Sequence, residues 1–262
     1  MQSPLPWLLL IGASAIGVGV YLWRSGASVP EPPPPVAAVE PSPAAPPPAP
    51  RILHPLPETP AAATPLPPLA SSDALITDTL TGLFGREAYA RFFYPEGLVR
   101  RFVATIDNLP RKTAAVQLMP VKPVPGNFVV SGNEKGIEIG AGNALRYRPY
   151  VLAMEAAEAK RLVAAYVRLY PLFQTAYQEL GYPQGYFNDR LVQAIDDLLA
   201  APDIAAPRLV QPKVLYEFAE ADLQERSAGQ KMMLRMGSGN AARVKDKLRA
   251  IRRELTGQLT AP

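Results

Sequence analysis

The chain has 262 residues and a formal net charge of +4, from 27 basic and 23 acidic side chains. It contains no cysteine, which excludes thiol nucleophiles, zinc–thiolate sites and disulfide frameworks. Its one histidine, His54, lies in a proline-rich tract. The folded part therefore offers no imidazole for a serine–histidine triad or a transition-metal site, and we expect neither a metal nor an organic cofactor.

Residues 1–24 are predicted to form a membrane anchor. The stretch from Trp7 to Trp23 carries no charge, and the apolar run rises about 28 Å as a helix, close to the roughly 30 Å thickness of the bilayer hydrocarbon. Aromatic residues at both ends suit the two membrane interfaces. The alternative is a signal peptide cleaved near Ala13–Ala15, but the leader lacks a basic side chain and apolar residues continue past that site.

The orientation of this span rests on weaker signals. Arg24 is the only charged side chain near it and nominally favours a cytoplasmic domain. A short leader, one span and a long following domain are, however, typical of a signal anchor, and the next segment has the composition of an exported spacer. We expect a single-pass protein of a bacterial inner membrane with its globular domain in the periplasm.

Residues 25–70 are predicted to be a disordered proline-rich linker. Between Pro30 and Pro68, 17 of the 39 residues are proline, a composition that cannot pack and prefers the extended polyproline conformation. At about 3.1 Å per residue, residues 26–70 would reach on the order of 140 Å when fully extended. The proline runs also resemble ligands of proline-binding modules, although spacing alone explains them.

Residues 71–262 are predicted to form one mainly α domain with a small extended or β insertion. The insertion is expected at residues 115–140, where glycine and proline interrupt short apolar runs. The helices are predicted from apolar periodicity and capping residues. The first helix begins at Ser71–Asp73 and the second covers 95–108. The third follows Pro149 and continues past Pro171 to Gly181, and the fourth starts at a cap formed by Asn188 or Asp189. Two more cover 217–236 and 241–255, the last with Asn240 as its cap.

The last predicted helix combines an apolar face with a strongly basic one. Its basic residues are Arg243, Lys245, Lys247, Arg249, Arg252 and Arg253. The simpler interpretation is the solvated outer face of a core-packed helix. The alternative is a docking surface for phospholipid headgroups, an anionic envelope polymer or an acidic protein. Nucleic acid is not an expected partner, because no recognised nucleic-acid module accompanies the basic residues.

Tyrosines are concentrated before Asn188, where seven occur within 40 residues. Each buried hydroxyl needs a hydrogen-bond partner, so this number exceeds what filling a core requires. With arginine and asparagine nearby, they predict a groove that binds a peptide or a glycan. The alternative places the rings at the core edge with their hydroxyls in water. The candidate ligand-binding residues here are Arg146, Tyr147, Tyr170, Tyr177, Tyr182 and Asn188.

A second candidate site lies at residues 230–240. Gly237 and Gly239 surround a helix junction whose free amides can hold a phosphate or a carboxylate. The candidate residues are Gln230, Lys231, Arg235 and Asn240. The glycine spacing matches neither a Walker loop nor a dinucleotide fingerprint. The alternative is an ordinary helix corner with Gly237 as the carboxyl-terminal cap.

The chain carries several short motifs: Arg146-Tyr147-x-Pro149-Tyr150, Tyr170-Pro171-Leu172, Leu180-Gly181-Tyr182, Phe187-Asn188, Gln230-Lys231 and Leu234-Arg235-Met236-Gly237 with Asn240. In combination they resemble an uncharacterised bacterial family, the domain of unknown function DUF3014. The resemblance covers about residues 69–255, and an anchor with a proline-rich spacer is also similar to that family's usual layout. Ser238-Gly239 departs from the proline expected at the helix junction. The resemblance implies no activity, cofactor or site residue.

The predicted function is a membrane-tethered binding or scaffold module of the cell envelope that binds a protein or an anionic envelope polymer. The competing hypothesis is a glycan-processing hydrolase that uses two carboxylates as acid and base. Its candidate carboxylates are Glu87, Glu96, Asp107, Asp189, Asp196 and Asp197. Their spacing selects no pair, so no catalytic residue is predicted and an enzyme is the less favoured reading. The sequence leaves the oligomeric state open.

Overall fold

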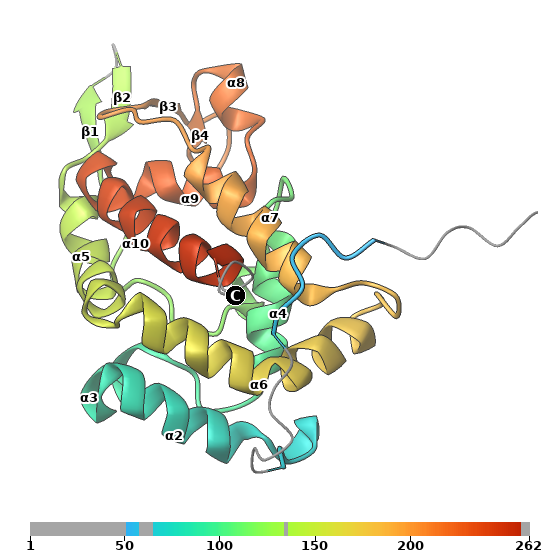
Figure 1. Cartoon of the computed structure of the whole chain (residues 1–262). Helices are drawn as coiled ribbons and strands as arrows, with labels where there is room; N and C mark the ends of the chain where they lie inside the picture. Colours follow the sequence, from blue (N-terminus) through green and yellow to red (C-terminus); the bar gives the residue numbers. More distant parts are fainter. Residues whose placement is uncertain (1–50, 58–64, 134–135, 258–262) are drawn as a thin grey trace, which may run out of the picture. The chain divides into compact units, whose positions relative to one another are not determined.

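The structure is a computed structural model that describes residues 51–57, 65–133 and 136–257. The predicted membrane span and much of the predicted linker lie outside these residues. Within the described ranges, no helix combines the length and the apolar character needed to cross a bilayer. The described domain is mainly helical and carries a small antiparallel sheet, so the mainly α fold with a β insertion is confirmed (Figure 1).

The described elements follow one another in a regular order. The helices are α2 (Asp73–Phe84), α3 (Arg86–Phe92), α4 (Leu98–Asn108), α5 (Gly142–Ala156), α6 (Ala159–Glu179), α7 (Phe187–Leu199), α8 (Ala221–Gln224), α9 (Ala228–Arg235) and α10 (Ser238–Gly257), with short 3-10 turns at η1 (Leu69–Ser71) and η2 (Val116–Leu118). The strands are β1 (Val130–Asn133), β2 (Gly136–Ile139), β3 (Arg208–Val210) and β4 (Glu217–Phe218).

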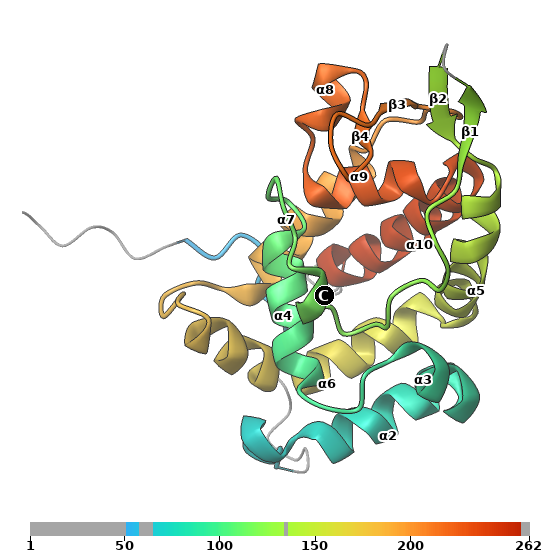
Figure 2. The same cartoon turned by 180° about the vertical axis from the view of Figure 1, so that it is seen from behind.

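The main hydrophobic core lies where α4, α6, α7 and α10 pack against one another. Each of these helices repeats its apolar residues every three or four positions, which gathers them on one face. The most deeply buried include Val103 of α4, Val163 of α6, Phe187 of α7 and Leu255 of α10. Helices α2 and α3 lie side by side along α6, at the end of the domain opposite the sheet (Figures 1 and 2).

The sheet joins two segments that are far apart in the sequence. Its order is β1-β2-β3-β4, and every neighbouring pair is antiparallel. Strands β1 and β2 come from the predicted extended insertion, and Ile137 of β2 pairs with Leu209 of β3. A second, smaller core of Leu209, Phe218, Leu223 and Leu234 packs between this sheet and α9. This second core explains why β3 and β4 form despite their shortness.

Two helix boundaries differ from the sequence-based prediction. Helix α5 begins at Gly142 rather than after Pro149, because buried Asn143 ties the helix start to the residue just before β1: its amide oxygen accepts from the Val129 N–H at 3.1 Å. The predicted helix over 217–236 is also wrong. Buried Phe218 pairs with β3 there, so tertiary packing overrides helical periodicity and α9 starts only at Ala228. Helix α3 was not predicted.

The predicted amino-terminal caps are also wrong, because each side chain has a different partner. The Ser72 hydroxyl donates to the Leu69 carbonyl at 2.8 Å instead of accepting from α2. Asn240 lies inside α10, and its amide donates to the carbonyl oxygens of Ala144 and Met236 at 2.8 and 2.9 Å. Helix α7 starts after Tyr186 with no side-chain cap. The side chains of the two residues predicted to cap it bind elsewhere.

Candidate functional site

The first turn of α7 holds a distant part of the chain. The Asp189 carboxylate accepts from the backbone N–H groups of Leu53 and His54, at 3.0 and 2.7 Å. The Asn188 amide donates to the His54 carbonyl at 2.8 Å. Just before the helix, the Tyr186 hydroxyl accepts from the backbone N–H of Leu56 at 2.9 Å. We call residues 53–56 the docked segment.

Asn188 is fully buried and has a fixed orientation. Its amide oxygen accepts from the Tyr166 hydroxyl at 3.2 Å, so its NH2 group turns toward the docked segment. The Asn188 backbone N–H donates to the Tyr170 hydroxyl at 3.4 Å, and that hydroxyl bonds Gln174 at 2.8 Å. Burial raises the pKa of both Tyr166 and Tyr170, so both hydroxyls stay protonated at neutral pH. We call Tyr166, Tyr170, Tyr186, Asn188 and Asp189 the tyrosine groove.

A polar cavity of about 810 Å³ adjoins the tyrosine groove. At its base lies Asp107, which is 5% exposed and pairs with Arg190 at 3.1 Å and with Arg111 at 2.6 Å. The Tyr182 hydroxyl donates to the same carboxylate at 3.3 Å, and its ring stacks on Tyr177 with centroids 4.5 Å apart. Asp107 thus fixes both guanidinium groups, while Leu53 and His54 of the docked segment line the cavity as well.

Four of the six candidates from the tyrosine-rich region come together here: Tyr170, Tyr177, Tyr182 and Asn188. The other two lie on α5. Arg146 donates to the carbonyl oxygens of Pro125 and Gly126, at 2.9 and 2.6 Å, and so holds the loop before β1. Burial raises the pKa of Tyr147, and the nearby guanidinium groups of Arg146 and Arg235 oppose this shift.

The candidates at 230–240 do not converge on one point. Gln230 donates to Asp197 at 3.0 Å, and the Lys231 ammonium donates to the carbonyl oxygens of Lys112 and Gln224, both at 3.1 Å. Arg235 lies over the ring of Phe218 at 5.3 Å from its centroid. Burial lowers the pKa of both Lys231 and Arg235.

A cleft of about 380 Å³ does lie at the junction of α9 and α10, and it includes Asn240. Gly237 forms this junction with a left-handed φ of 86°, as expected for a carboxyl-terminal cap. The predicted helix corner therefore exists. Its polar candidates, however, are already bonded to other parts of the domain.

Three of the six basic residues of α10 form ion pairs with described carboxylates. Arg243 pairs with Glu155 at 3.1 Å, Arg249 pairs with Asp246 at 2.7 Å, and Arg252 pairs with Asp196. The Lys247 ammonium donates to the carbonyl oxygens of Glu155 and Ala157 at 2.9 and 2.7 Å. These contacts attach α10 to α5 and α7, which favours the structural reading of the basic residues over a docking surface.

Three of the candidate carboxylates line the polar cavity: Asp107, Asp189 and Asp196. Each is bonded to a different structural partner: two arginines, the docked backbone and Arg252, respectively. Asp197 points away from them and accepts from Ser227 at 2.6 Å. Each of these four carboxylates therefore has a hydrogen-bond or ion-pair partner among the described residues.

The sequence reasoning missed the docked segment and the two arginines paired with Asp107. The docked segment was assigned to the linker because of its prolines. A compositional signal was present, however, since Ile52, Leu53 and Leu56 interrupt the alanine–proline pattern with large apolar residues next to the only histidine. Arg111 and Arg190 have no distinctive spacing, so only the fold identifies them.

These features define a mainly helical domain that holds a stretch of its own chain in a tyrosine-lined groove. A family model described as a protein of unknown function (DUF3014) matches residues 98–252, from the start of α4 into α10. The chain belongs to this family. The matched stretch contains the tyrosine groove and excludes the docked segment. Searches of the curated proteins and of the solved structures gave no match.

Proposed function

We propose that this protein is a tethered binding module whose tyrosine groove recognises the backbone of a short, proline-containing polypeptide segment. The observation that carries this proposal is the set of four hydrogen bonds between the groove and the main chain of the docked segment. Contacts to main-chain groups supply affinity with little demand on sequence. Leu53 fits this mode, because it is 66% exposed while its N–H is bonded.

The proposal keeps the predicted tether and location. A single span in a bacterial inner membrane and a periplasmic domain would bring the groove within reach of envelope proteins. An envelope protein is the favoured partner over an anionic polymer, because Arg243, Arg249 and Arg252 of α10 are paired with carboxylates of the domain. A hydrolase is less favoured, since every carboxylate that lines the polar cavity has a structural partner.

The docked segment would compete with such a partner. Because it is part of the same chain, its effective concentration at the groove is on the order of 1 mM. A partner must therefore bind more tightly than the docked segment, or be held nearby in large amounts. This competition can be measured directly.

The test uses the full chain in detergent, with residues 51–57 replaced by glycine and serine in the same number. A fluorescently labelled peptide of residues 51–57 is added in trans, and its anisotropy reports binding. We expect the replaced chain to bind this peptide at least about tenfold more tightly than the natural chain, because its groove is vacant.

Adding Asp189→Ala to the replaced chain should abolish binding, whereas Asp78→Ala, a change of an exposed carboxylate on α2, should leave it intact. A replaced chain with native helical content that fails to bind the peptide would refute the proposal. Equal binding by the Asp189→Ala variant would refute the assigned groove.

A further inference from the structure

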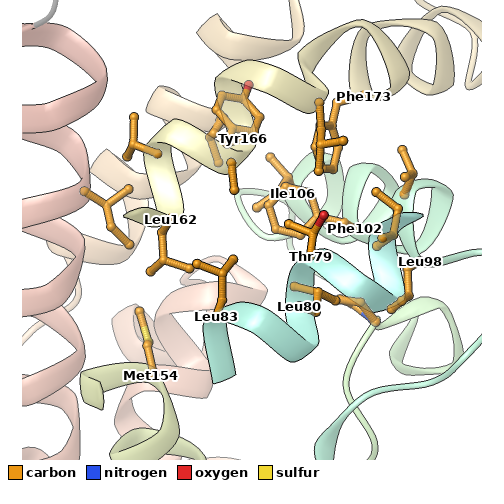
Figure 3. A pocket seen from close by; sticks show the side chains of 18 of the residues that line it. Thr79, Leu80, Leu83, Leu98, Phe102, Ile106, Met154, Leu162, Tyr166 and Phe173 are labelled. Atoms are coloured by element: carbon orange, nitrogen blue, oxygen red, sulfur yellow. The ribbon is translucent and has the colours of Figure 1, made fainter. Parts of the chain in front are cut away.

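A second cavity lies in the main core, and Tyr166 is the one residue of the tyrosine groove that also lines it. It has a volume of about 320 Å³ and is enclosed mainly by α2, α4, α6, α7 and α10 (Figure 3). An engineered cavity of about 150 Å³ with similar walls already takes up benzene, and natural small-molecule sites begin near about 300 Å³. The cavity is therefore large enough for a ligand.

The wall of this cavity provides no free polar group. Only two of its lining side chains, Thr79 and Tyr166, contain oxygen or nitrogen. The Thr79 hydroxyl donates to the Leu75 carbonyl at 2.8 Å, and the Tyr166 hydroxyl donates to Asn188 at 3.2 Å. Water in such a cavity would lack the two to four partners that it needs, so the wall selects hydrocarbon.

The cavity extends along α6. On α6 its lining residues extend from Leu162 to Phe173, about three helical turns or roughly 16 Å. Figure 3 shows Leu162 and Met154 toward one side and Phe173 and Leu98 toward the other. An unbranched chain of that length can contact the wall from Leu162 to Phe173, whereas a single ring contacts only part of it.

One end of the cavity lies next to a cation. Leu83 of α2 and Leu162 of α6 are half-buried lining residues, and the exposed Arg161 beside Leu162 donates to the Gly82 carbonyl at 3.2 Å. This bond occupies one of the five N–H donors of the guanidinium group. The remaining donors can bind a carboxylate or a phosphate at the surface.

We propose that this cavity binds one unbranched hydrocarbon chain of an anionic amphiphile, with the headgroup outside at Arg161. A free fatty acid and a membrane phospholipid share this chemistry. The site goes beyond the proposed peptide groove, and either one can exist without the other.

The test places the full chain in phosphatidylcholine nanodiscs and follows the fluorescence of cis-parinaric acid, with empty nanodiscs as the background. We expect saturable binding that palmitate displaces. Displacement by added phosphatidylglycerol but not by palmitate would identify a phospholipid as the source of the chain. Ala165→Phe places a ring in the cavity and should weaken binding at least about tenfold.

Because Ala165→Phe changes the core, a surface variant provides a second readout. Arg161→Glu should weaken binding of palmitate about tenfold and leave binding of uncharged palmityl alcohol unchanged. Arg168→Glu, an exposed change two turns further along α6, should affect neither ligand. A fluorescence signal equal to that of empty nanodiscs, or equal binding by the natural chain and a folded Ala165→Phe variant, would overturn the proposal.

Discussion

At the scale of single residues, Asn188 serves the fold and the proposed site together. Replacing Asn188 with alanine leaves the Tyr166 hydroxyl and the His54 carbonyl without their partner. We expect the free energy of unfolding to fall by about 1–3 kcal/mol, the usual cost of an unsatisfied buried polar group. Urea unfolding followed by circular dichroism measures this change.

Asp189→Ala is the matched comparison, because it also releases the docked segment but changes a half-buried side chain. Its cost should be smaller, about 0.5–1.5 kcal/mol. If the free energy of unfolding fell by the same small amount in both variants, Asn188 would contribute no more to the groove than Asp189.

The sequence indicates Asn188 as part of a groove, but it predicts a helix cap in place of the contact with His54. Asparagine before an apolar run is typical of a helix cap, and the seven nearby tyrosines indicated a groove. The bond to His54 joins residues 134 positions apart, and no local pattern encodes such a contact. Composition indicates Arg146 as a groove residue as well, yet its guanidinium holds a neighbouring loop.

At the scale of elements, the β1–β2 hairpin depends on one glycine. Gly132 has a φ of 108°, and a Cβ atom there would lie 2.0 Å from the carbonyl oxygen of Gly136. We expect Gly132→Ala to lower the free energy of unfolding by about 1–3 kcal/mol or more, because backbone strain adds to the clash. Urea denaturation measures this change in the free energy of unfolding.

Gly136→Ala is the control within the same hairpin, since its added Cβ meets no atom within 4 Å. It should cost less than about 1 kcal/mol. Similar losses for the two variants would show that the hairpin does not require the left-handed conformation of Gly132.

Elements with a strong apolar period were the predictable ones. Helices α4, α7 and α10 bury the residues that their periodicity selects, such as Val103 and Leu248. The prediction of a helix at strand β4 is wrong. Phe218 is positioned by its pairing with Leu209, and its sequence neighbours carry no signal of that pairing. Short strands that pair over long distances carry little local signal, which is why the sheet was only half predicted.

At the scale of the whole molecule, tyrosines with raised pKa values limit the stability of the folded state at alkaline pH. Burial raises the pKa of five of them: Tyr147, Tyr150, Tyr166, Tyr170 and Tyr177. In the unfolded chain they ionise near pH 10, so the folded state binds their protons more tightly. Their stabilising effect is complete below about pH 10 and is lost as the pH rises toward the higher values of the folded state.

We therefore expect the free energy of unfolding to fall as the pH rises above about 10, with the tyrosinate absorbance of these five residues appearing together with unfolding. Tyr166→Phe should make this fall less steep, and comparing slopes separates the effect from the lost bond to Asn188. Tyrosinate absorbance from all tyrosines near pH 10 in a folded domain would contradict the prediction.

In the proposed tethered protein, the docked segment would also determine how far the domain can move from its anchor. With residues 53–56 bound to α7, the proposed tether would end at Leu53, although the next contact with the main core along the described chain is at Leu66. Release of the segment would add up to about 40 Å of extended chain. A partner that displaces the docked segment would therefore lengthen the linker between the anchor and the domain. A single binding event would change both the occupancy of the groove and the distance that the domain can reach.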